Sequence, residues 1–140
     1  MKFMMIVKAS KESEAGVMPT EELLNQMQKY NEELMKAGVL VDLTGLHPSS
    51  EGARIQFSEG KRTVIDGPFA ETKELIGGFW IINVKSKEEA MEWAMRAPAP
   101  HPGGSGEIEV RQFFELDDLA DLAPKEAVDR ARELEKKLHS

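Results

Sequence analysis

The sequence contains no cysteine, no excess of basic residues and no long apolar run. Without cysteine, the chain has no disulfide framework, no thiol nucleophile and no cysteine-ligated metal site. Its 18 Lys and Arg residues are outnumbered by 25 Asp and Glu residues, and the net charge of −7 works against binding to nucleic acid or to an anionic membrane surface. No window reaches the roughly 20 apolar residues that a membrane span requires. We therefore predict a cytoplasmic protein that has neither nucleic acid nor a membrane as a partner.

The motifs of common catalytic and cofactor sites are also missing. The sequence has no HxH or HExxH pair, no Asp-rich calcium loop, no nucleophile elbow, no phosphate-binding loop and no dinucleotide fingerprint. His47 and Asp66 alone would not fill a tetrahedral metal site. We therefore predict no metal and no cofactor.

The 140 residues, of which 41% are hydrophobic, suffice for one folded unit with a sizeable core. Apolar runs predict strands, which we place at residues 3–8, 39–46, 53–58, 61–65, 78–84 and 107–116. Apolar stripes at helical spacing predict helices, which we place at residues 20–38, 86–97 and 124–138. Thr20 and Ser86 are suited to cap the first two helices. The Pro- and Gly-rich residues 97–106 are predicted to be a mobile connection without regular structure.

The order strand, helix, strand, hairpin, strand, helix, strand is the split β-α-β pattern of a ferredoxin-like α+β sheet with an inserted hairpin. Its helices lie on one face of the sheet. The strands are nevertheless apolar on both faces, because Phe79 and Ile81 point one way while Trp80, Ile82 and Val84 point the other. A second subunit could cover the bare face, which predicts a homodimer with Trp80 or its neighbours buried. The C-terminal helix could instead cover this face within one chain.

The run "DGPFAETKELIGGFWI", residues 66–81, resembles the signature of the DGPF proteins in the YCII-related family. The opening "MKFMMIVK", the residues Gly45, Leu46 and Pro48, and "IEVR" at 108–111 support this resemblance, which covers about residues 1–116. It implies a dimeric α+β barrel of ferredoxin-like subunits with a cleft beside the sheet. We accordingly predict a domain at residues 1–116 and a C-terminal helical extension at residues 117–140.

The chain also departs from that family pattern. Short YCII proteins pair a His on the first helix with an Asp just before the Pro that ends the second helix, and by our alignment these positions hold Met27 and Ala97. A mechanism based on that pair is therefore not implied for this chain. Gln112 stands where many DGPF members have proline.

The loop between the hairpin and the following strand contains the residues that we consider first for chemistry. Asp66, Gly67 and Pro68 are typical of a turn, in which Asp accepts backbone hydrogen bonds. Alternatively, Asp66 is a general base at a strand end facing a cleft. The same loop has three residues that we predict to hold it against the domain, which are Phe69, Gly77 and Gly78.

Charged residues around this loop suggest a site for an anion. Glu71 either lies on a solvated loop face or pairs with Arg111, whose guanidinium could hold a carboxylate substrate. Arg111 could equally have Glu109 or Glu71 as a structural partner. His47 and His101 are either proton carriers above a cleft or exposed turn residues.

Three functions are compatible with these patterns. The first is a small-molecule-binding protein or cofactor-free enzyme acting on a small polar or anionic compound, with Asp66, His47, Glu71 and Arg111 as its site. The second is a non-catalytic regulatory or accessory module that binds a ligand or a protein. The third is a domain whose role is to assemble. A buried titratable group beside an apolar pocket would indicate an enzyme, and a pocket without one would indicate a binding module.

Overall fold

The computed structural model describes the backbone of residues 1–140 and every side chain except that of Pro102. The strands are β1 (Lys2–Lys8), β2 (Leu40–Gly45), β3 (Ala53–Ser58), β4 (Lys61–Asp66), β5 (Ile76–Asn83) and β6 (Ile108–Gln112). The helices are α1 (Lys11–Glu14), α2 (Glu21–Lys36), α3 (Lys87–Arg96), α4 (Leu116–Ala120) and α5 (Lys125–Leu138). Three short 3-10 turns are η1 (Ser49–Glu51), η2 (Thr72–Glu74) and η3 (Pro102–Gly104).

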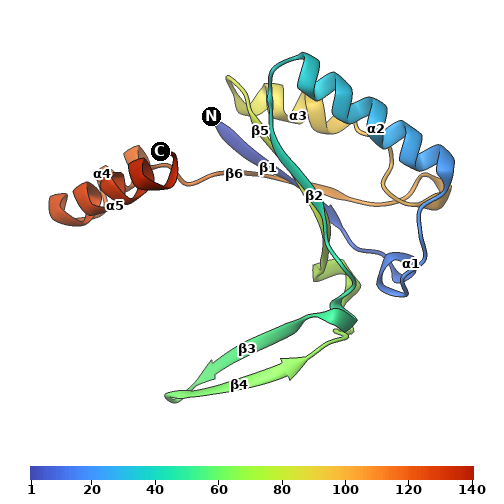
Figure 1. The fold of residues 1–140 in the computed structure, drawn as a ribbon, viewed down its shortest axis with the longest axis horizontal. Coiled ribbons are helices and arrows are strands. Elements are labelled where there is room, and N and C mark those ends of the chain that lie inside the picture. Colours follow the sequence, from blue (N-terminus) through green and yellow to red (C-terminus); the bar gives the residue numbers. More distant parts are fainter.

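Four strands form one antiparallel sheet in the order β2-β5-β1-β6, and β3 and β4 form a separate two-stranded hairpin. Helices α2 and α3 lie side by side on one face of the four-stranded sheet (Figure 1). This arrangement confirms the predicted ferredoxin-like α+β fold with an inserted hairpin. No helix among the described residues combines the length and the apolar character that crossing a membrane would take.

The predicted caps set the ends of the two sheet-covering helices. The Thr20 side chain accepts a hydrogen bond from the Leu23 N–H at 3.2 Å, and the Ser86 side chain accepts one from the Glu89 N–H at 3.1 Å. After α2, the backbone turns into the next strand through Gly38, whose positive φ of 72° favours glycine. These local signals are visible in the sequence, which explains why both helices were predicted correctly.

The core lies between the sheet and the two helices, around Tyr30. The Tyr30 ring meets the Trp80 and Trp93 rings edge-on, at centroid distances of 5.3 and 6.4 Å. Its hydroxyl donates a hydrogen bond to the Trp93 carbonyl at 2.6 Å. Burial raises the pKa of Tyr30 to about 12, because the ionised phenolate would lose its hydration. One side chain of α2 is thus tied to both the sheet and α3.

The orientation of the strands corrects the predicted role of Trp80. Trp80 and Ile82 are buried under the helices as part of this core. The opposite face of the sheet, which we call the open face, exposes apolar residues from the two central strands. They are Met4, Phe79 and Ile81, each partly exposed, whereas Ile6, opposite Phe79 on the same face, is only 6% exposed and is therefore buried. Of the predicted interface residues, Trp80 is therefore covered by the helices, while its neighbours Phe79 and Ile81 remain on the open face and their burial by a second subunit stays a prediction. Alternation separates two faces without telling which one the helices cover.

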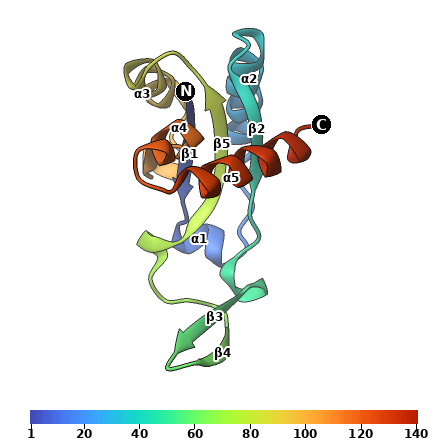
Figure 2. The same ribbon diagram turned by 90° about the vertical axis from the view of Figure 1, so that its left-hand side faces the viewer.

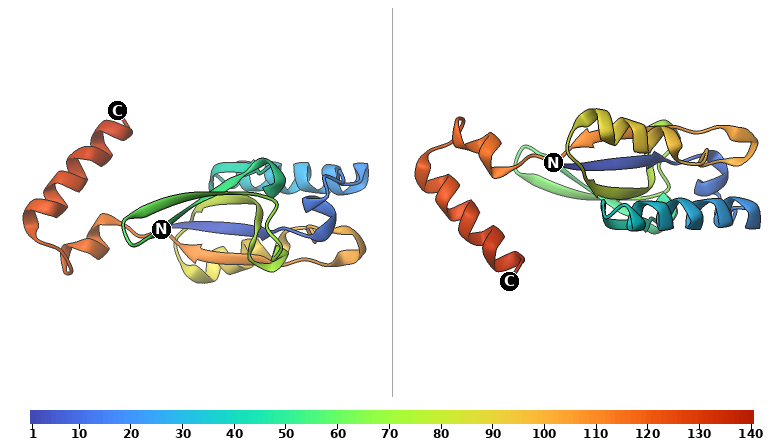
Figure 3. Two further views of the ribbon diagram at one scale, coloured as in Figure 1. Left: turned by 90° about the horizontal axis from the view of Figure 1, so that it is seen from below. Right: turned by 90° about the horizontal axis from the view of Figure 1, so that it is seen from above.

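Two parts of the chain project from this layered body. Every residue of the β3–β4 hairpin is exposed. Beyond β6, helices α4 and α5 pack on each other, with Val128 buried and Arg132 3.2 Å from the Asp117 carboxylate. Figures 1 and 3 show these two helices standing apart from the sheet, and Figure 2 shows the hairpin below the sheet. The C-terminal helix therefore does not cover the open face within one chain.

The connection at residues 97–106 is more ordered than predicted. It contains η3, and His101 and Ser105 form an isolated β-bridge. Gly103 and Gly104 adopt positive φ angles of 80° and 74°, which allow the tight turn between the bridge residues. The prediction of a segment without regular structure is wrong, since the same glycines that disfavour a strand permit this turn. Helices α1 and α4 were also not predicted.

Candidate functional site

A cavity of ≈ 600 Å³ opens where β1 and β2 end and β5 begins. Helix α1, the loop that follows it and the first turns of α2 form one side, and the 97–106 connection contributes to the rim. The apolar side chains of its wall are Val7, Val17, Met18, Pro19, Leu23, Met27, Leu46, Pro48 and Pro100. A volume of this size is suited to a small organic molecule, because known ligand pockets span about 300–1,000 Å³.

Local hydrogen bonds fix the wall that α1 contributes. Ser10 and Ser13 cap this short helix reciprocally, each side chain accepting from the other's backbone N–H at 3.1 and 2.9 Å. Gly16, with a φ of 79°, lets the chain reverse towards Val17 and Met18. On the opposite side, the Leu46 N–H donates to the Gly77 carbonyl at 2.9 Å, which holds the end of β2 against β5. The wall is therefore held by backbone geometry as well as by side-chain packing.

The polar groups of the cavity lie at its rim. His47 Nδ1 is 3.0 Å from Glu51 Oε2, and the His47 side chain is 85% exposed. His101 Nε2 is 2.8 Å from the Lys8 carbonyl oxygen, which can only accept, so Nε2 carries the proton. Glu12 is a further carboxylate of the lining. Among the lining residues that the structure describes there is no Lys or Arg. The rim thus offers carboxylates and imidazoles to a ligand.

The other predicted site residues lie outside this cavity. Asp66 ends β4, paired with Ala53 in the hairpin. Glu71 is fully exposed before η2, where a hydrogen bond with the Glu74 side chain and the Glu74 charge raise its pKa. Arg111 lies on β6, with its Nε 3.8 Å from Glu109 Oε2. Of the four predicted residues only His47 lines the cavity, and a joint pocket of Asp66, Glu71 and Arg111 stays a prediction.

Arg111 and Glu109 form the structural pair that the sequence offered as one alternative. Both lie on the open face, since their neighbours Ile108 and Val110 pack against the core. Glu109 also approaches the Lys8 ammonium at 3.3 Å. The Glu109 carboxylate therefore lies between two cations. Such exposed pairs contribute little to stability, typically about 0–1 kcal/mol each.

Ser49 holds the turn at residues 66–69. Its hydroxyl accepts a hydrogen bond from the Phe69 N–H at 3.0 Å and donates one to Glu14 Oε1, while its own N–H donates to Glu14 Oε2 at 2.9 Å. Gly67 packs so closely that a Cβ there would lie 1.7 Å from the Ser49 carbonyl oxygen. Glycine is thus required at position 67 by this contact.

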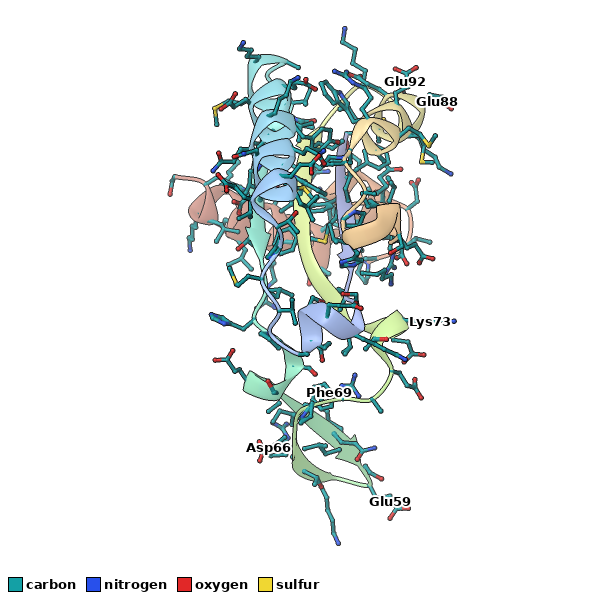
Figure 4. All side chains as sticks on the ribbon, turned by 90° about the vertical axis from the view of Figure 1, so that its right-hand side faces the viewer. Glu59, Asp66, Phe69, Lys73, Glu88 and Glu92 are labelled. Atoms are coloured by element: carbon teal, nitrogen blue, oxygen red, sulfur yellow. The ribbon has the colours of Figure 1, made fainter. Side chains whose placement is uncertain are left out.

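Phe69 packs on the hairpin rather than in the domain core. The Arg54 guanidinium lies 3.8 Å from the centroid of its ring, and the ring is only half-buried. Figure 4 shows Phe69 and Asp66 near the root of the hairpin, with Glu59 at its tip. At the start of β5, a Cβ on Gly78 would lie 2.7 Å from the Thr44 carbonyl oxygen, whereas one on Gly77 would make ordinary contacts. The close backbone approach predicted for both glycines is found at Gly78.

Sequence reasoning missed the cavity and the contact between Glu14 and Ser49. The spacing of Ser10 and Ser13 is that of a capping box with serine at the third helical position, and this signal could have indicated α1. Without α1, the sequence did not show that Glu14 comes close to Ser49, 35 residues away.

The comparisons with known proteins agree with the fold. The family model of the YCII-related domain matches residues 1–115. An uncharacterized protein of Rhizobium meliloti (strain 1021) is 34% identical over 91 residues, which cover 65% of this chain and 73% of that protein. The matched part ends just before α4, so helices α4 and α5 lie outside the family model.

Proposed function

We propose that this chain, which belongs to the YCII-related family, is a small-molecule-binding protein whose ligand occupies the cavity at the end of β1 and β2. The observation that carries this proposal is the cavity itself, with apolar walls and a few polar groups at the rim. This is the usual composition of ligand sites, in which apolar contacts supply affinity and the polar groups set orientation. Met27, which by our alignment replaces the His of short family members, lies in this wall.

The charges of the lining indicate the class of ligand. Glu12 and Glu51 are carboxylates, and the described lining has no cation to oppose them. An anionic ligand would meet like charge here, whereas an amine or a hydroxyl could donate to Glu51 or to a neutral His47. We therefore expect a neutral or cationic molecule with an apolar body. An anionic compound would be better suited to Arg111, outside the cavity.

Burial favours binding over catalysis. Of the titratable groups that line the cavity, Glu12, His47 and Glu51 are exposed and His101 is only partly buried, so none of these four is fully shielded from water. A non-catalytic regulatory or accessory module is consistent with such a site. A cofactor-free enzyme is the second candidate, since His47 Nδ1 is engaged by Glu51 and leaves Nε2 to accept a proton from a ligand.

A matched series of probes tests the proposal. Naphthylmethylamine, naphthylmethanol and naphthoate share one ring system and differ in charge. A ligand that binds only the native state raises the unfolding midpoint. We expect the amine and the alcohol to raise the thermal midpoint more than the carboxylate does. Titrations are then repeated with Met27→Trp and Leu46→Trp, each of which places a larger side chain in the wall, and with Arg111→Ala as the control outside the cavity.

The two wall variants should weaken binding, while the Arg111 variant should leave it unchanged. Because Leu46 is exposed, Leu46→Trp narrows the cavity without disturbing the core. It therefore tests the site even where Met27→Trp perturbs the packing of the core. Unchanged affinity in both folded wall variants would rule out the cavity as the site. Loss of binding in Arg111→Ala alone would instead support the predicted anion site. If the wild type converts a bound probe and the His47→Ala variant does not, the result favours the enzyme.

The homodimer is the second part of the proposal. It is supported by the open face, where the partly exposed Met4, Phe79 and Ile81 form an apolar band that no helix of the described residues packs against. We expect Ile81→Glu to give a monomer in native mass measurements, because a carboxylate buried between two sheets would lack a partner. Met95→Glu, on the outer side of the helix layer, is the control and should leave the mass unchanged. A monomeric wild type at micromolar concentration would contradict the dimer.

A further inference from the structure

The β3–β4 hairpin exposes an apolar surface that a single chain leaves without a partner. Ile55 and Val64 are directly opposite each other on one face, and Phe57 lies on the same face. Phe57 is 66% exposed and is approached only by the Arg62 guanidinium, 4.9 Å from its ring centroid, among the ring contacts that the structure describes. A two-stranded hairpin without further cover is marginally stable in water. This face is therefore suited to packing against another surface.

The C-terminal arm, defined as residues 116–138, has a second apolar surface. Leu134 and Leu138 are four residues apart and so lie on one face of α5. They are 69% and 77% exposed, because α5 uses Val128 rather than these leucines for its buried contact. The two helices of the arm pack on each other, and Figure 1 shows the arm standing apart from the four-stranded sheet. Leu134 and Leu138 therefore form an apolar face of α5 that has no partner among the described residues of its own chain.

The charges of the two surfaces are complementary. Residues 53–66 of the hairpin carry three basic and two acidic side chains, although the whole chain has a net charge of −7. Residues 116–138 of the arm carry seven acidic and five basic side chains. Complementary potentials steer association and disfavour contacts between like-charged surfaces. The hairpin therefore matches the C-terminal arm better than it matches another hairpin.

The placement of the two elements selects a second copy as the partner. Figure 1 shows the hairpin and the C-terminal helices on different sides of the space in front of the open face. A two-fold axis through that space would carry each hairpin towards the other chain's arm, and each arm towards the other hairpin. Two-fold interfaces are self-complementary in this way, because a contact from residue i to residue j is repeated from j to i.

We propose that the homodimer is closed by a reciprocal clasp, in which the β3–β4 hairpin of each copy packs on the C-terminal arm of the other. The inference rests on the proposed homodimer and adds to it an interface outside the sheets. It also assigns a role to helices α4 and α5, which lie beyond the matched family domain. The apolar core of the clasp consists of Ile55, Phe57 and Val64 from one chain with Leu134 and Leu138 from the other.

The absence of cysteine makes a cross-linking test specific. Val64→Cys and Leu134→Cys are introduced into two differently tagged copies of the full chain, which are co-expressed and treated with a short bismaleimide. The clasp predicts a covalent heterodimer of the two tagged chains. The control pair, Met95→Cys with Leu134→Cys, should not cross-link, because Met95 lies on the outer side of the helix layer. A cross-link that forms within one chain carrying both substitutions would overturn the proposal.

A second measurement uses the dimer itself. Leu134→Glu and Leu138→Glu should each raise the dimer dissociation constant about tenfold or more, the effect of losing one buried leucine, while Met95→Glu should change it less than about twofold. If both leucine variants leave the dimer dissociation constant unchanged and no interchain cross-link forms, the clasp is overturned and the sheet-to-sheet dimer remains. A monomeric wild type would overturn both. Capture of a different protein by the arm in place of the second copy would likewise overturn the clasp.

Discussion

Replacing Tyr30 with phenylalanine removes one hydroxyl and keeps the ring that packs between Trp80 and Trp93. The hydroxyl donates to the Trp93 carbonyl, which belongs to the last turn of α3. Carbonyls of a last turn have no N–H of their own helix to accept from. The Ala97 N–H, which would reach Trp93 in a continued helix, donates to Ala94 instead. The Tyr30 hydroxyl on α2 therefore supplies the hydrogen bond that the Trp93 carbonyl at the end of α3 does not receive from its own helix.

The magnitude follows from the burial of this pair. Tyr30 is 3% exposed, so in the variant the Trp93 carbonyl keeps no access to water through the tyrosine site. Leaving a buried acceptor unpaired costs about 1–3 kcal/mol, and the unchanged ring keeps the apolar contribution. We expect a loss of about 2 kcal/mol in the free energy of unfolding, which is roughly a 1 M lower urea midpoint at an m-value of about 2 kcal/mol per M.

The assay is urea unfolding followed by tryptophan fluorescence and by far-UV circular dichroism. Coincident curves from the two probes would establish two-state unfolding, which the free energy requires. The m-value should be unchanged, because the surface exposed on unfolding is the same in both proteins. A loss below about 0.5 kcal/mol with an intact m-value would refute the assigned role of the hydroxyl, since even a typical net hydrogen bond contributes about that much.

Three further predictions concern pH, Ser49 and Gly67. The pKa of Tyr30 is raised from 10.0 to about 12 on folding, so the unfolded chain loses this proton first and stability should fall between pH 10 and 12, by up to about 3 kcal/mol in total. Urea midpoints at pH 9 and 11 should show about 1.4 kcal/mol of this loss in the wild type and not in Tyr30→Phe. Ser49→Ala should speed hydrogen exchange of the Phe69 amide roughly three- to tenfold, because that N–H loses its acceptor; an unchanged rate would contradict the contact. Gly67→Ala should lower the thermal midpoint by an amount equivalent to about 1–3 kcal/mol, because its Cβ would clash with the Ser49 backbone. The control is Gly52→Ala, whose Cβ would lie 3.5 Å from the Ser49 carbonyl oxygen and which should lower the midpoint less. Equal losses in the two variants would argue against the clash.

Local signals in the sequence predicted most of the fold. The caps at Thr20 and Ser86 depend on hydrogen bonds within three residues, and Glu59 and Gly60 turn the hairpin with positive φ angles of 48° and 79°. The face of each strand was harder to assign. Trp80 and Ile81 alternate whichever side the helices take, and only the packing of Tyr30 on Trp80 decides it. Alternation is a local property, while the choice of covered face is a long-range one.

The cavity could not be predicted for a related reason. Its wall combines residues as distant in sequence as Val7, Met27, Leu46 and Pro100, and no short motif links them. His47 was predicted because it follows a strand and precedes Pro48, which places it at a sheet end. The sequence could not show that Asp66 leaves with the hairpin, since the direction in which a hairpin projects depends on contacts at its root such as that of Gly67 with Gly52.

The position of the cavity separates the lining of the proposed ligand site from the residues that keep the protein folded. Val17, Met18 and Leu46 form part of the wall but are exposed and lie outside the core. Exchanging exposed residues usually changes stability by less than about 0.5 kcal/mol, so these three positions can be varied almost freely. Met27 is the exception, because it also packs against the core. A library randomised at positions 17, 18 and 46 would therefore vary the shape of the proposed ligand site on a scaffold whose folding stays the same.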